Sequence, residues 1–208
     1  MHILIVFACY MASAARSAPL PENSSALVED SQFQEILQKS RSLTQKILDS
    51  IPDTHKSCVH TETLQLNSSE NAKLATMAST IGIPRAPVLR AVSENFTLEA
   101  GLRAMHDGLQ LHQELLTSIS PRLGMKKNVA VLISDVRDLK IQIVKMQKMT
   151  QMQATVPPMS TSVELRLPGD YYVQVAAHLT LDQLRAFSQD VARCLRSLDL
   201  SDDDGKES

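Results

Sequence analysis

The strongest constraint on the fold of this chain is a helical seam in its middle, from Leu98 to Gly124. Apolar or semi-apolar residues recur there at alternating spacings of four and three, which is the pattern of a helix packed lengthwise against other helices. The positions are Leu98, Leu102, Met105, Leu109, His112, Leu116, Ile119 and Leu123. Proline disfavours helix in the residue before it and donates no amide, so we expect this helix to stop at Ser120-Pro121. A second helical pattern begins after Gly124, and two long helices joined by so short a turn are expected to pack antiparallel.

Four long helices are predicted in all. They cover about residues 28–51, where Pro52 is expected to end the helix, and about 96–119, 125–150 and 170–198. A brief helical piece is possible over 70–80. The first and last connections are some 40 and 19 residues long, which lets the first helix run parallel to the second and the third parallel to the fourth. The sequence therefore predicts an all-α, up-up-down-down four-helix bundle, with helices ~36–44 Å long as in the long-chain cytokines.

The two ends of the chain differ from this central domain. Residues 1–17 combine an apolar run with small residues before a cleavage site, which is typical of a secretory signal peptide. Three sequons, at Asn23, Asn67 and Asn95, can carry glycan only in a secretory lumen. We therefore expect a secreted, extracellular glycoprotein with a signal peptide (1–17), a four-helix domain (18–198) and an acidic, disordered tail (199–208).

Composition excludes several functional classes. The formal net charge is −2, so no general attraction to nucleic acid or to an anionic membrane is expected. No segment after residue 17 approaches the ~20 apolar residues of a membrane span, so membrane insertion is not expected. The sequence also contains no Gly-rich phosphate loop and no Gly-x-Ser-x-Gly motif. We expect neither an enzyme nor a cofactor.

Cysteine and histidine residues offer three candidate sites. Cys58 and Cys194 are the only thiols after residue 17, and an even pair in a secreted chain suggests a bridge. However, Cys194 lies ~36 Å along the fourth helix from the end where Cys58 is expected, and a disulfide needs Cα atoms ~4.4–6.8 Å apart. We therefore expect no disulfide. His55, Cys58 and His60 have metal-ligand spacing but lack a fourth ligand, so we expect no metal site. His112 is expected to be a core histidine bonded to a neighbour, with a pH-responsive role as the alternative.

Several passages resemble the granulocyte colony-stimulating factor family. They are IGIPRAP at 81–87, GLRAMHDGLQLHQELLTSISPRLG at 101–124, SDVRDL at 134–139 and AAHL at 176–179. The family has a similar Gly-Ile-Pro-aromatic-Ala-Pro segment, a Gly-Leu pair with Leu-Leu seven residues on, and an Ile-Ser-Pro-x-Leu-Gly turn. The resemblance is good over the second and third helices, moderate over the fourth and poor over the first. The wider group also contains interleukin-six and an avian myelomonocytic growth factor.

The chain departs from the family at its cysteines. The family places a cysteine where this chain has Gly101, an aromatic where it has His112, and the partner of that cysteine near Ala91. A second family disulfide would need a partner for Cys58 where Pro52 now stands. Both family disulfides are therefore expected to be absent, which identifies the chain as a diverged member.

The resemblance also implies receptor-binding residues. Asp135 and Asp138 lie outside the seam of the third helix and are expected to be exposed. Spacing alone fits a solvated face, but the matching acidic pair of the family faces the cytokine-binding module of its receptor. Glu62 is similar to an acidic residue at the family's second receptor contact, and Glu35 could complete the first patch. Two lysines farther along the helix, at 145 and 148, are expected to matter less.

The resulting hypothesis is a secreted cytokine that binds and clusters a class I cytokine receptor, acts on myeloid cells of the granulocyte lineage, and is monomeric before binding. An interleukin-six-like cytokine is the alternative within this class. A secreted helical carrier of an apolar ligand is the alternative from another class. A filled core among Leu109, Leu132 and Phe187 would favour a cytokine, whereas a connected apolar cavity of ~300 Å³ or more would favour a carrier.

Overall fold

The computed structural model describes residues 27, 29–66, 68–89, 97–124, 126–150 and 163–198, apart from the side chains of Ser69 and Glu70. Within these ranges every regular element is helical and there is no strand. Several predictions lie outside the described residues: the signal peptide 1–17, the tail 199–208, and the sequon residues Asn23, Asn67 and Asn95.

The helices lie close to where the sequence predicts them. In chain order they are α2 (Ser31–Cys58), η1 (Ser69–Leu74), α3 (Ala75–Ile81), α4 (Leu98–Ile119), η2 (Ser120–Arg122), α5 (Lys126–Met149) and α6 (Asp170–Ser197). The bounds of α4, α5 and α6 agree with the predicted ranges to within two residues, and η1 with α3 accounts for the short helical piece in the first connection.

Side-chain caps explain where two of these helices start. The Asp30 carboxylate accepts hydrogen bonds from the N–H groups of Gln32 (2.8 Å) and Phe33 (3.0 Å) at the start of α2. The Thr97 hydroxyl accepts one from the N–H of Ala100 (3.2 Å) at the start of α4. Each cap satisfies amide donors that the first turn of a helix leaves without a partner.

The predicted end of the first helix at Pro52 is wrong, because α2 continues to Cys58. Pro52 is exposed, so its ring faces solvent on the outer side of the helix. The turns after it are held from the inner side, where Thr54, His55 and Cys58 are buried. Tertiary packing beyond the proline thus outweighs the loss of one backbone hydrogen bond.

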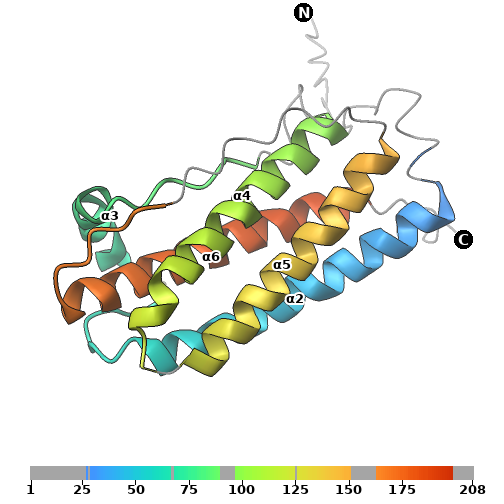
Figure 1. The fold of residues 1–208 in the computed structure, drawn as a ribbon. Helices are drawn as coiled ribbons and strands as arrows, with labels where there is room; N and C mark the ends of the chain where they lie inside the picture. The colour runs from blue at the N-terminus through green and yellow to red at the C-terminus, as the bar shows by residue number, and fades with distance from the viewer. Residues whose placement is uncertain are drawn as a thin grey trace, which may run out of the picture.

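The four long helices pack side by side, and Figure 1 shows α3 set beside the start of α6. Helices α2 and α4 each pack against both α5 and α6. The α4–α5 pair is antiparallel, as predicted, since Gln147 near the end of α5 donates from Nε2 to the carbonyl of Leu102 near the start of α4 (3.1 Å).

Two apolar clusters form the core. The larger one draws on all four long helices. The smaller one lies where the connections meet the helix ends; it includes Cys58, Leu64, Ile81, Ile119, Leu123, Val129 and Val173.

The two long connections are bonded to each other. The N–H of Arg166, in the segment before α6, donates to the carbonyl of Ile81 at the end of α3 (2.8 Å). Arg122 donates from its guanidinium to the carbonyl of Leu167 (2.7 Å) and so ties the α4–α5 turn to the same segment. The end of the bundle beside α3 is therefore closed by one joined set of loops.

Candidate functional site

Asp135 does not have the exposure that the sequence predicts. Its side chain is only 6% exposed, and its Oδ1 accepts a 2.7 Å hydrogen bond from the ammonium of Lys46 on α2. Its Oδ2 is buried and has no hydrogen-bond partner among the described residues. The expectation of an exposed Asp135 is therefore wrong. The carboxylate lies at the α2–α5 contact because α5 turns this side, beside its apolar seam, toward α2.

Asp138, one turn farther along α5, retains the predicted accessibility. Its side chain is 48% exposed, and its carboxylate lies 3.5 Å from the guanidinium of Arg137, which is 56% exposed. Exposed pairs of this kind contribute little to stability. Asp138 is thus available to a partner, with a cation beside it.

Glu35 is exposed on α2 and lines a hollow of about 450 Å³ between α2 and the end of α5. The other charged side chains that line this hollow are all basic: Lys39, Lys145 and Lys148. Glu35 therefore lies at the α2–α5 contact in a basic environment, in a hollow whose lining does not include Asp138.

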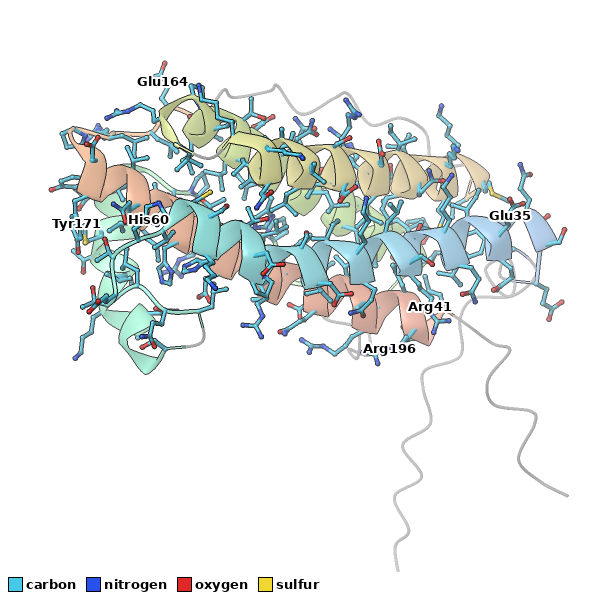
Figure 2. The ribbon with its side chains drawn as sticks, turned by 90° about the horizontal axis from the view of Figure 1, so that it is seen from below. Glu35, Arg41, His60, Glu164, Tyr171 and Arg196 are labelled. Carbon is cyan, nitrogen blue, oxygen red and sulfur yellow. The ribbon has the colours of Figure 1, made fainter. Side chains whose placement is uncertain are left out.

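Glu62 lies at the opposite end of the bundle. It is exposed in the loop after α2 and lines a shallow hollow with Lys56 and His60. Figure 2 labels Glu35 near the start of α2 and His60 just beyond its end. At 1.5 Å per residue, the 28 residues of α2 place these ends roughly 40 Å apart. Glu62 therefore belongs to a separate surface from Glu35 and Asp138.

A partly buried row of hydrogen-bonded side chains connects α2, η1 and α6, and no sequence pattern predicted it. His55 Nε2 lies 2.9 Å from His178 Nδ1, and His178 Nε2 lies 3.0 Å from Asn71 Oδ1. Asn71 Nδ2 donates in turn to Asp182 Oδ2 (3.2 Å). The sequence shows a histidine before Cys58 and another in the AAHL passage, but the two are 123 positions apart and no pattern pairs them.

The donor and the acceptor of each of these hydrogen bonds can be assigned from the chemistry of the groups. Because an amide oxygen only accepts, His178 must donate from Nε2 to Asn71, which leaves Nδ1 to accept from His55. With both rings protonated, both nitrogens of the His55–His178 bond would be donors, so this bond requires at least one neutral ring. Burial, and then the neighbouring His178, lower the pKa of His55 to about 4, although Asp182 acts in the opposite direction. Burial likewise lowers the pKa of His178, again against Asp182.

His112 is a core histidine bonded to a neighbour, as predicted. It is fully buried, and its Nδ1 lies 2.7 Å from the carbonyl of Gly108, to which it must donate. Its ring packs on Phe187 of α6 with ring centroids 5.2 Å apart. Burial lowers its pKa to about 4 despite the bond to Gly108. The chain therefore keeps a neutral imidazole between α4 and α6.

Both described cysteines are free, buried thiols in different core clusters. Burial raises the pKa of Cys194 to about 11, with a further contribution from Asp190, and burial also raises the pKa of Cys58. Protonated, enclosed thiols react poorly. They act as small core residues.

Two other kinds of site can be assessed in the part of the chain that the structure covers. No group of three or more His, Cys, Asp or Glu side chains there is arranged to hold a metal ion. None of the helices described above is both long and apolar enough to cross a membrane.

The interior among the helices is filled: Leu109 and Leu132 are 0% exposed and Phe187 is 3% exposed.

The chain has a distant relationship to granulocyte colony-stimulating factor. No family model matches it. A granulocyte colony-stimulating factor of Felis catus is 29% identical to it over 127 residues, which cover 60% of this chain and 64% of that protein. The match thus spans slightly less than two thirds of the relative's length.

Proposed function

We propose that this chain is a secreted helical cytokine that binds and clusters a class I cytokine receptor, acting on myeloid cells of the granulocyte lineage. The observation that carries the proposal is the 29% identity with a granulocyte colony-stimulating factor in a chain made of four long packed helices. The proposed activity is recognition alone, with no chemical step. Secretion, a cleaved signal peptide and glycosylation at the three sequons belong to the same proposal.

The proposal includes the up-up-down-down arrangement. Three pairs of contacts support it: Lys46 of α2 with Asp135 of α5, His55 of α2 with His178 of α6, and Gln147 of α5 with Leu102 of α4. The last two pairs each join the end of one helix to a residue near the start of another, which fits antiparallel helices. Lys46 and Asp135 lie near the middle of their helices, but the hollow lined by Glu35 and Lys148 joins the start of α2 to the end of α5. The colour progression along each helix in Figure 1 agrees with them.

Two receptor surfaces are proposed. The first is the α2–α5 face around Asp138 and Glu35, and the second is the loop around Glu62 at the other end of α2. Asp135 has a different role in this scheme: its bond to Lys46 holds α2 against α5 and so positions the first surface.

A panel of class I cytokine-receptor ectodomains tests the proposal directly. We expect the purified full chain to bind at least one granulocyte-lineage receptor as a monomer and to bring receptor chains together. Binding only to interleukin-six-type receptors would favour the alternative cytokine, and no binding across the panel would refute the proposal. Asp138→Lys should weaken binding at least tenfold, ~1.4 kcal/mol, with unchanged helicity. Glu164→Lys, the same charge change at an exposed residue before α6 that does not line the hollow of Glu62, is the control.

The carrier alternative finds no support in the core. A Cβ atom added to Gly108 would lie 2.1 Å from the Phe187 ring, so the α4–α6 contact has no room for a ligand. We therefore retain the cytokine proposal.

A further inference from the structure

The first half of α2 is bordered by two basic grooves. Figure 2 shows α2 in front, with α5 along one side of it and α6 along the other. The hollow that contains Glu35 lies on the α5 side, and a larger hollow of about 730 Å³ lies on the α6 side, where Arg41 and Arg196 are seen close together. We call these the α2–α5 groove and the α2–α6 groove. Their cations are Lys39, Lys145 and Lys148 in the first, and Arg41, Arg193 and Arg196 in the second.

Charge on this face is opposite in sign to that of the whole chain. Six cations line the two grooves, whereas Glu35 is the one acid among the lining side chains recorded for them. Asp190 adds a second acid through its ion pair with Arg193. The balance is strongly positive on a chain whose formal net charge is −2. The face is therefore positively charged, although the net charge of the chain is negative.

The remaining lining is mixed in the α2–α5 groove, where Ile36 and Met149 accompany Gln32 and Gln142, and is mostly polar in the α2–α6 groove. The α2–α6 groove also contains Gln38, Gln45 and Gln189, whose amides can donate and accept. The large hydrophobic side chains that stand exposed among the described residues are Val88, Val131, Ile141 and Tyr171, and none of them belongs to α2. The core of a protein–protein interface is usually apolar or aromatic. The cations and amides of the two grooves suit a hydrophilic polyanion, which would compete with the proposed receptor where the α2–α5 groove includes Glu35.

We propose that this face binds a sulfated polysaccharide that lies across α2 and reaches both grooves. Guanidinium groups bind sulfate-like oxyanions with paired hydrogen bonds, and lysine supplies point charges. A helix with its side chains is ~10–12 Å across, so an acidic side chain of a compact partner would occupy one groove, whereas a linear chain can cross the helix into both. This inference does not rest on the proposed receptor.

Two other polyanions fit less well. Single-stranded nucleic acid is bound through aromatic side chains that stack on its bases, and the described tyrosines, Tyr171 and Tyr172, lie at the start of α6, the opposite end from Arg193 and Arg196. Peripheral membrane helices insert large apolar residues beside their basic ones, which α2 does not present.

The test is a titration of a heparin dodecasaccharide into the full chain, repeated at several salt concentrations. Two double variants remove cations from one groove each: Lys145→Gln with Lys148→Gln, and Arg41→Gln with Arg196→Gln. The matched control is Lys126→Gln with Lys127→Gln, which removes the same charge from exposed positions at the other end of α5. Each groove variant should bind at least about fivefold more weakly, with a shallower dependence of affinity on salt, because fewer counterions are released. The control should change affinity less than twofold.

Several results would overturn the proposal. One is no binding of heparin to the wild-type chain at 0.15 M salt, and another is an equal loss in all three variants, which would reflect overall charge. Tighter binding to phosphatidylserine vesicles, to a single-stranded oligonucleotide or to a poly-glutamate peptide than to heparin would assign the face to another partner. A measurement on the wild-type chain avoids any folding defect of the variants: heparin should protect Lys39, Lys145 and Lys148 from acetylation but leave Lys126 and Lys127 reactive. Equal protection of both sets would contradict the proposal.

Discussion

Replacing Gly108 by alanine should destabilise the bundle, although the same change in a helix normally stabilises it. A Cβ atom at this position would lie 2.1 Å from Cζ and 2.4 Å from Cε2 of Phe187. Carbon atoms in contact are normally ~3.5–4.0 Å apart, so the ring would have to move by more than 1 Å. Phe187 is 3% exposed and packs on His112, so it has nowhere to move without disturbing the core.

The expected size follows from two opposing terms. Overpacking a core costs about 1–3 kcal/mol, and an overlap this deep belongs at the upper end of that range. Alanine gains about 1 kcal/mol over glycine in a helix interior. The net loss in the free energy of unfolding should therefore be about 2 kcal/mol, measured by urea denaturation followed by circular dichroism.

Two further variants identify the cause. Gly124→Ala is the control, since a Cβ there meets nothing within 4 Å, and it should change stability by less than about 0.5 kcal/mol. In a Phe187→Leu background the ring is gone, and Gly108→Ala should become neutral or stabilising. A wild-type midpoint for Gly108→Ala alone would refute the argument that Phe187 packs directly on the α4 backbone.

Three other outcomes are expected. Leu109→Ala should cost about 2–5 kcal/mol, because the residue is fully buried in the seam, and a loss below ~1 kcal/mol in urea denaturation would show that it is not a core residue. Lys46→Met should lower the free energy of unfolding by about 1–2 kcal/mol, because it leaves the buried carboxylate of Asp135 without its cation. A larger effect is not expected, since Lys46 is 58% exposed. An unchanged melting midpoint would contradict the pairing. Burial, and then His178, lower the pKa of His55 to about 4 in the folded state, so the unfolded state binds more protons below pH 6.5. The free energy of unfolding should therefore be full above that pH and fall toward pH 4. His55→Gln should flatten this dependence, and an equally steep profile in the variant would contradict the role of His55.

The helices could be predicted because their signals are local. The four–three spacing of the seam set the range of α4, and Pro121 set its end. Pro52 misled the prediction because a proline on the outer side of a helix is tolerated when the following turns are anchored. That anchor is His55, whose partner His178 lies 123 residues away.

The candidate site was less predictable, because exposure depends on the neighbouring helix. Asp135 and Asp138 are equally polar and only three residues apart, but Asp135 meets Lys46 from 89 positions earlier in the chain and becomes buried. The position of Gly108, next to the seam residue Leu109, likewise gives no sign that Phe187 will pack on it. Such contacts follow from how the helices are rotated and shifted against one another, which spacing within one helix does not determine.

The same contacts have a consequence for how the helices are aligned lengthwise. A seam that repeats every three to four residues looks similar after a shift of one turn, ~5.4 Å, so apolar packing alone would tolerate slipped bundles. Three unlike contacts, each between a different pair of helices, occur at one position only: Lys46 with Asp135, His55 with His178, and Gly108 with Phe187. A one-turn slip would separate an ion pair, leave buried imidazoles without partners, or drive a phenyl ring into a side chain. These contacts therefore set the lengthwise register of the bundle. Three are enough, because together they link all four helices.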